Sequence, residues 1–243
     1  MSNKKSKSKN PAFVIMRREL RSYFSGPIGY IVTGLFLVLN GLLFFAAFFL
    51  QNRAELRNFF SLLPMLLSFF IPAVTMRVFS EEKRVGSIET LMTLPVREID
   101  VVTGKYLAVL IESLVMLAPT LFYVITAEVF GSPDYGPIIG GYLGAIFIIA
   151  AYSSIGLFCS SITKNQIIAF AVAMAICLAL TFVESFLVFL PDGIVKLFSF
   201  ISASVHFGSI SKGIVDTRDV LYFVSLTALF FVLTVRLEAK SKR

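Results

Sequence analysis

Long apolar stretches without charge alternate with short charged segments along the chain. Residues 28–50 hold 23 residues without a charge, and residues 58–76 hold 19 between two arginines. A helix of about 20 apolar residues crosses the hydrocarbon core of a bilayer. The pattern therefore predicts an all-α integral membrane protein with six transmembrane helices, at about 28–50, 58–76, 106–128, 138–162, 166–190 and 220–236. A seventh stretch, Leu197–Ser211, is shorter and is expected to be a re-entrant or interfacial segment on the outer side.

Composition agrees with a lipid-embedded chain. The sequence is 57% hydrophobic and 15% charged, whereas a soluble domain is about a quarter charged. This excludes a water-soluble globular enzyme and a disordered linker. We expect a six-span domain at 28–236, preceded by a basic tail and interfacial helix at 1–27 and followed by a basic tail at 237–243.

The positions of lysine and arginine predict the orientation. Seventeen of the 22 lie before the first span, in the loops after the second and fourth spans, or in the final tail. The other five are on the opposite side, so the positive-inside rule places both termini in the cytoplasm of a multi-pass inner-membrane protein. Basic residues that flank a membrane in this way favour lipid as a partner and argue against nucleic acid.

An amphipathic helix is expected before the first span. Phe13, Met16, Leu20 and Phe24 recur at helical spacing, which predicts a helix lying in the headgroup layer with its cations toward anionic lipid. The Gly26-Pro27 pair ends this segment. The alternative is a basic anchor that only determines topology.

The loop after the second span predicts a second amphipathic helix, over Ser80–Leu94. Ser80 is expected to cap it, Gly86 to interrupt it and Pro95 to stop it, with Glu89 on its solvent face. The alternative is a linker that lies on the membrane surface.

Three acids lie in or near spans. Glu112, Glu128 and Glu184 are candidates for function by their position, and structural or gating roles are favoured over a proton relay because two lie near an interface. His206, the only histidine, is interpreted as a structural or headgroup-level residue and not as a ligand. Gly140-x-x-x-Gly144 predicts close helix packing, with a dimer seam as one interpretation.

No catalytic motif is present. The only Gly-Lys pair, Gly104-Lys105, is followed by tyrosine and is no phosphate-binding loop. His-Glu-x-x-His and Gly-x-Ser-x-Gly are also missing. The chain is therefore expected not to be an enzyme and to hold no metal or cofactor.

The segment Ile71–Pro95, IPAVTMRVFSEEKRVGSIETLMTLP, followed by Gly104-Lys105-Tyr106, resembles the signature of type-2 ABC exporter permeases. Softer motifs resemble the gliding-motility-associated permease subunits (GldF type): Gly26-Pro27-Ile28-Gly29-Tyr30, Leu39-Asn40-Gly41-Leu42 and Asn165–Phe170. The resemblance extends over essentially the whole chain.

This resemblance implies an N-terminal elbow helix, outer re-entrant helices and a cytoplasmic coupling helix that docks on a separate ATPase subunit. That partner would bind ATP and magnesium, and a second permease chain, identical or paralogous, would complete the transporter. The residues that match the coupling signature are Arg77, Glu81, Glu82, Lys83, Gly86, Glu89 and Pro95.

Two alternatives remain from the sequence. A stand-alone secondary transporter or channel would favour internal repeats and acids at the midplane. A non-transporting membrane subunit would apply ATP hydrolysis to a secretion or gliding apparatus, and it would need the same coupling helix.

Overall fold

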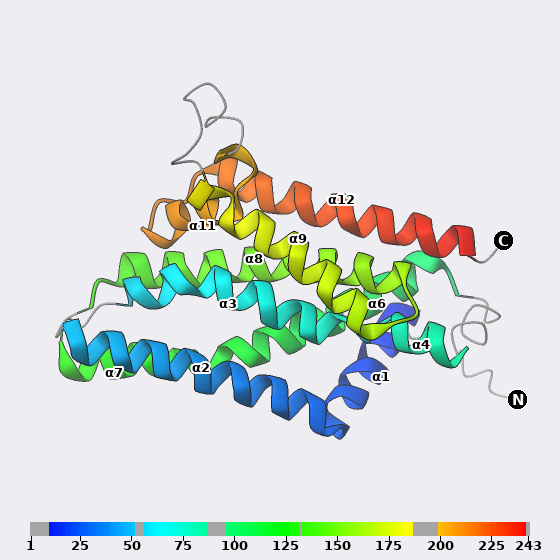
Figure 1. The fold of residues 1–243 in the computed structure, drawn as a ribbon, viewed down its shortest axis with the longest axis horizontal. Coiled ribbons are helices and arrows are strands. Elements are labelled where there is room, and N and C mark those ends of the chain that lie inside the picture. The colour runs from blue at the N-terminus through cyan, green and yellow to red at the C-terminus, as the bar shows by residue number, and fades with distance from the viewer. Residues whose placement is uncertain (1–9, 52–55, 87–95, 132, 187–198, 242–243) are drawn as a thin grey trace, which may run out of the picture.

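The computed structural model describes residues 10–51, 56–86, 96–131, 133–186 and 199–241. Throughout these ranges the regular structure is helical, without a strand (Figure 1). Six long helices run roughly along one direction. They are α2 (Pro27–Gln51), α3 (Arg57–Thr75), α6 (Glu98–Leu117), α8 (Tyr135–Ile162), α9 (Gln166–Phe186) and α12 (Thr217–Ser241).

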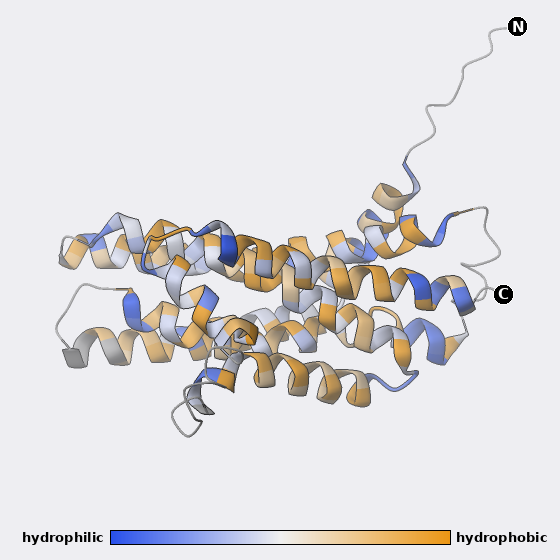
Figure 2. Ribbon diagram, turned by 90° about the horizontal axis from the view of Figure 1, so that it is seen from above, coloured by the Kyte–Doolittle hydropathy of each residue, from blue (hydrophilic) through white to orange (hydrophobic). Residues whose placement is uncertain are grey.

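Six helical stretches in the described ranges are long and apolar enough to cross a membrane, which confirms the expected number. Figure 2 shows hydrophobic residues along these helices, with hydrophilic ones mostly toward the two ends of the bundle. The fifth expected span, 166–190, runs past the end of α9 into residues outside the described ranges.

The third span is longer and less regular than the sequence predicted. Its helix begins at Glu98, eight residues before the expected start at 106. At Pro119 it tightens into the short 3-10 helix η1 (Ala118–Thr120) and continues as α7 (Leu121–Phe130). Proline has no backbone N–H to donate to the preceding turn, which explains the irregularity.

Helix α8 lies at the centre of the bundle, packed against α3, α6, α9, α11 (Ala203–Ser211) and α12. Glycines bring its neighbours close. A Cβ at Gly156 would lie 2.0 Å from Thr75 Oγ1 of α3, and one at Gly140 would lie 2.2 Å from the carbonyl oxygen of Ile210 in α11. Gly140 and Gly144 both contact α11. The Gly140-x-x-x-Gly144 motif therefore lies in a contact between two helices of the same chain, and not in the dimer interface considered from the sequence.

Part of the seventh apolar stretch forms α11, which His206 ties to the start of α12. The ring Nδ1 lies 2.6 Å from Asp219 Oδ1, and Nε2 lies 3.0 Å from the carbonyl oxygen of Phe200. The imidazole also stacks on Tyr222 at 4.2 Å. These contacts give His206 a structural role.

The packing at Gly140 can be tested with one methyl group. In Gly140→Ala the added carbon would force α11 away from α8, so we expect a loss of about 1–3 kcal/mol of stability. Gly34→Ala is the matched control, since a Cβ at Gly34 on α2 meets nothing within 4 Å. Thermal melting in detergent, followed by size-exclusion chromatography, should show a lower melting temperature for Gly140→Ala alone. Equal melting of both variants would contradict the close contact.

Candidate functional site

Two short helices, α1 (Pro11–Ser25) and α4 (Ser80–Val85), lie at the end of the bundle where α12 terminates (Figure 1). Helix α4 is the described part of the expected coupling helix. It has six residues and ends at Gly86, whose φ of +77° favours glycine. Two predicted coupling residues, Glu89 and Pro95, lie outside the described residues.

The start of α4 is held by a residue that the sequence did not indicate. Ser160 of α8 accepts hydrogen bonds from the backbone N–H groups of Phe79 and Ser80, both at 3.1 Å, and its hydroxyl donates to the Met76 carbonyl at 3.0 Å. The prediction that Ser80 caps the helix is wrong, because the Ser80 hydroxyl donates back to the Met76 carbonyl. The cap comes from a helix 80 residues further along the chain.

Helix α1 packs directly on α6 because Gly104 admits it. A Cβ at Gly104 would lie 2.6 Å from the carbonyl oxygen of Ala12 and 2.9 Å from Ile15. Ala12 and Ile15 are the buried residues of α1. On a helix, Glu19 follows Ile15 at the next turn of the same face, and so comes to lie against α6.

The next residue of α6, Lys105, is fully buried and joins three helices. Its ammonium lies 2.9 Å from Glu82 Oε2 of α4 and 3.2 Å from Glu19 Oε1 of α1. It donates to the Val78 carbonyl at 2.7 Å and lies 5.0 Å from the centre of the Phe79 ring. From the sequence, Lys105 is expected only as a charge that orients the span and as part of the Gly104-Lys105-Tyr106 motif, without these partners.

Arg18 closes this ionic cluster on the solvent side. Its guanidinium donates to Glu19 at 2.7 Å and to Glu82 at 2.8 Å. Burial alone would raise the pKa of Glu19, but the charges and hydrogen bonds of Lys105 and Arg18 outweigh burial and hold the pKa below its usual value. The Glu19 carboxylate therefore remains ionised at neutral pH. We call Arg18, Glu19, Glu82 and Lys105 the ionic cluster.

A second ion pair holds the other side of α4. Lys83 lies 2.7 Å from Glu238 Oε1 near the end of α12, and it donates to the Ser161 carbonyl of α8 at 2.5 Å. The Glu238 side chain is 1% exposed. Since Glu82 and Lys83 are consecutive, the two faces of α4 are attached to different parts of the bundle.

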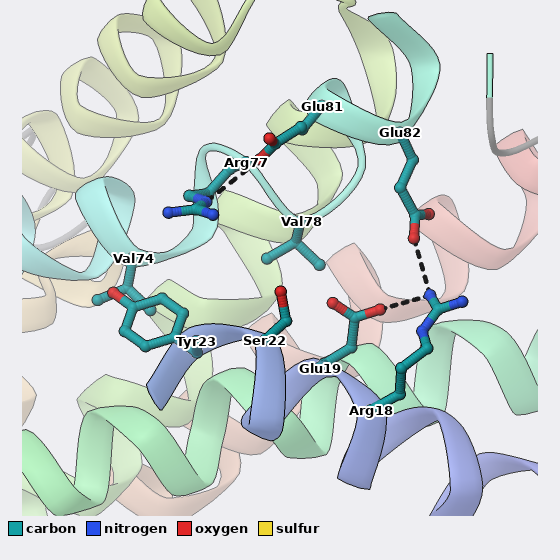
Figure 3. A pocket seen from close by; sticks show the side chains of 9 residues that line it. All are labelled: Arg18, Glu19, Ser22, Tyr23, Val74, Arg77, Val78, Glu81 and Glu82. Carbon is teal, nitrogen blue, oxygen red and sulfur yellow. Dashed lines mark hydrogen bonds and ion pairs between the residues drawn. The ribbon is translucent and has the colours of Figure 1, made fainter. Parts of the chain in front are cut away.

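The remaining described signature residues, Arg77 and Glu81, lie beside a cavity between α1 and the turn that joins α3 to α4 (Figure 3). Arg77 Nε lies 3.3 Å from Glu81 Oε2. Five of the seven predicted coupling residues are thus described, and four of them make ion pairs within the chain. The fifth, Gly86, ends α4.

The three intramembrane acids differ in their surroundings. Glu112 is 4% exposed and its Oε1 has no hydrogen-bond partner among the described residues. Glu128 accepts a hydrogen bond from the Tyr135 hydroxyl at 2.7 Å, and Glu184 is exposed. The structure does not bring the three acids together.

A comparison with models of known protein families gives a match over most of the chain. The model of a family described as "ABC-2 family transporter protein" matches residues 23–236. This range includes α4, Lys105 and all six long helices apart from the end of α12, whereas Arg18, Glu19 and Glu238 lie outside it. No curated protein matches the chain.

The ionic cluster can be tested at its buried cation. In Lys105→Met the carboxylates of Glu19 and Glu82 would lose their inner partner, and removing one member of a buried pair costs about 3–5 kcal/mol. Since both acids are about one-fifth exposed and keep Arg18, we expect about 2–3 kcal/mol here. Thermal melting of the detergent-solubilised chain measures the effect.

Two controls separate charge from bulk. Arg84→Met removes an exposed cation of α4 and should leave the melting temperature unchanged. The triple variant Lys105→Met, Glu19→Gln, Glu82→Gln should recover most of the stability, since no buried charge is left without a partner and Arg18, which loses both carboxylates, is 51% exposed. If the triple variant melts as low as Lys105→Met, Lys105 acts by its shape and not by its charge.

Proposed function

The chain belongs to the ABC-2 family of transporter proteins, and from that premise we propose that it is the permease subunit of an ATP-driven exporter, with α1, α4 and both termini in the cytoplasm. ABC-2 permeases work with ABC ATPase subunits. In this proposal, a partner ATPase binds and hydrolyses ATP with magnesium, and α4 carries its movement to the membrane helices. A second permease chain, identical or paralogous, completes the complex.

The observation that carries this proposal is the attachment of α4 on both faces. Glu82 connects it to α1 and α6, and Lys83 connects it to α8 and α12. A six-residue helix has too few internal hydrogen bonds to be stable alone. Held in this way, it moves together with three membrane-spanning helices, which is what transmission from a docked ATPase requires.

The cytoplasmic placement rests on charge and on arrangement. Seventeen of the 22 lysines and arginines fall on the side proposed as cytoplasmic. Helix α1, helix α4 and the end of α12 lie at one end of the bundle (Figure 1), which agrees with a single membrane face for all three. Residues 51–57 and 191–219 are then outside.

The softer resemblance to gliding-associated permeases has structural explanations. Asn40 donates to the Phe36 carbonyl in its own helix, and Asn165 caps α9 by accepting from the Ile167 N–H at 2.9 Å. A Cβ at Gly29 would lie 2.5 Å from the Tyr23 ring. Any permease of this fold can use such contacts, so they favour no particular apparatus, and export is the function we propose.

Cysteine labelling tests the topology. In a background with Cys159→Ala and Cys177→Ala, we expect Ser87→Cys to react with an impermeant reagent only from the cytoplasmic side. Val215→Cys, which replaces an exposed residue between α11 and α12, should react only from outside. Labelling of Ser87→Cys in intact cells would overturn the proposed orientation.

ATPase measurements on the reconstituted complex test the role of α4. We expect Glu82→Gln to leave the ATPase bound but to uncouple hydrolysis from the permease, because α4 loses its attachment to α1 and α6. Gly86→Val should act similarly, since a β-branched residue resists a φ of +77°. Glu89→Ala lies in the segment proposed to contact the partner, so it should weaken binding itself.

Lys212→Gln serves as a control, since it removes an exposed charge at the opposite end of the bundle. Pull-down of the ATPase and permease-stimulated hydrolysis report binding and coupling separately. Normal binding and coupling in all three α4-region variants would remove the coupling role. Transport by the chain without any ATPase would instead favour the secondary-transporter alternative.

A further inference from the structure

A cavity of about 280 Å³ separates α1 from the turn between α3 and α4. In Figure 3, Ser22 and Tyr23 of α1 lie on one side of it, with Arg77, Val78 and Glu81 on the other. Val74 and Val78 make part of its wall apolar. The function proposed above uses the ion pairs around this cavity but not the space itself.

Three side chains on the cavity wall, Arg77, Tyr23 and Ser22, carry hydrogen-bond donors. The Arg77 guanidinium donates no hydrogen bond and has one ion pair, with Glu81 at 3.3 Å. The Tyr23 hydroxyl is buried without a partner among the described residues, and Ser22 is exposed. Burial, and in addition the charge of Glu112, raise the pKa of Tyr23 above its ordinary value, so the hydroxyl remains a donor. Unused donors beside a guanidinium favour a ligand rich in acceptor oxygens, such as a phosphate group.

The net charge of the site narrows the choice of ligand. Arg18 and Arg77 line the cavity with Glu19, Glu81 and Glu82, and Lys105 lies directly behind two of these acids. Three cations therefore balance three carboxylates. A ligand whose phosphate engages Arg77 would leave Glu81 without its cation unless the ligand carried a positive charge of its own. Glu81, at 41% side-chain exposure, is accessible to such a group.

The surroundings of the cavity point to lipid as the source of this ligand. Phe24 and Tyr30 are exposed where α1 turns into α2, and their rings lie 6.5 Å apart. Exposed aromatic rings near the end of a span are typical of the headgroup level. The cavity thus has ionic groups on one side and apolar residues beside it, which is the chemistry of the boundary between headgroups and acyl chains.

We propose that this cavity binds the headgroup of a phosphoethanolamine-type lipid, with its phosphate on Arg77, Tyr23 and Ser22 and its ammonium on Glu81. The inference rests on the membrane placement in the proposed function, but it requires neither the ATPase nor coupling. Phosphatidylcholine is less suited, because its quaternary ammonium has no N–H to donate to Glu81. Phosphatidylglycerol is less suited, because it would add an uncompensated negative charge.

Native mass spectrometry of the full-length chain in detergent tests the proposal directly. The chain is incubated with equal amounts of phosphatidylethanolamine, phosphatidylcholine and phosphatidylglycerol, and retained lipid is counted. We expect phosphatidylethanolamine to be retained in preference to the other two. Tyr23→Phe should weaken its binding about fivefold, the effect of one lost hydrogen bond. Tyr135→Phe, which changes an exposed tyrosine at the start of α8 outside the cavity, should have no effect.

Charge variants give the sharpest result. Glu81→Gln makes the site net positive, so preference should shift from phosphatidylethanolamine to phosphatidylglycerol. Arg77→Gln should abolish retention of phosphatidylethanolamine and of phosphatidylglycerol. If Arg77→Gln fails to fold, Tyr23→Phe and Ser22→Ala remove donors without changing charge and test the same site.

Two results would overturn the proposal. One is the same lipid preference in the original chain and in Glu81→Gln. The other is displacement of the lipid by soluble phosphoethanolamine or inorganic phosphate at equal concentration, which would identify a soluble phosphate ligand instead. Because no ATPase is present in these measurements, a failure here leaves the coupling role intact, and a failure of coupling leaves lipid binding intact.

Discussion

The buried ammonium of Lys105 determines how the end of the bundle that carries α1, α4 and the end of α12 is built. A charge with no exposure to water is costly unless opposite charges and hydrogen bonds surround it. Neither carboxylate that meets it belongs to its own helix: one comes from α1 and the other from α4. Helices α1 and α4 must therefore both dock on α6 before this charge is compensated. Removing either helix would leave the other in an unfavourable electrostatic environment.

Close approach of the helices comes from small residues. Apolar side chains gain little by leaving lipid for protein, so tight van der Waals contact must supply much of the association. Gly104 admits α1 to α6, Gly140 admits α11 to α8, and Gly156 admits Thr75 of α3. Gly104 and Lys105 act in sequence: the glycine removes the bulk that would separate α1 from α6, and the lysine then binds the acid that α1 brings.

The sequence predicted features that depend on local chemistry. Six spans follow from hydropathy, because every backbone group in lipid must be satisfied within a helix, and the end of α4 follows from Gly86. Contacts between distant residues were missed: Lys105 and Glu19 are 86 residues apart, and Ser160 caps a helix 80 residues before it. No periodicity marks such pairs. The Gly104-Lys105 pair at the start of the third span is the one local signal for these contacts, and from the sequence it indicates only a family motif.

The size of α4 explains why its attachments matter more than its own stability. Six residues extend about 9 Å along the helix axis, and consecutive side chains project about 100° apart, so Glu82 and Lys83 reach different neighbours. Glu82 holds α1 and α6, and Lys83 holds α8 and α12. A displacement of α4 must then move these helices or break ion pairs that are largely shielded from water. The cavity beside α1 is lined by Arg18, Glu19 and Glu82, which also form this attachment. A ligand in the cavity would therefore act on the same contacts through which α4 holds the membrane helices.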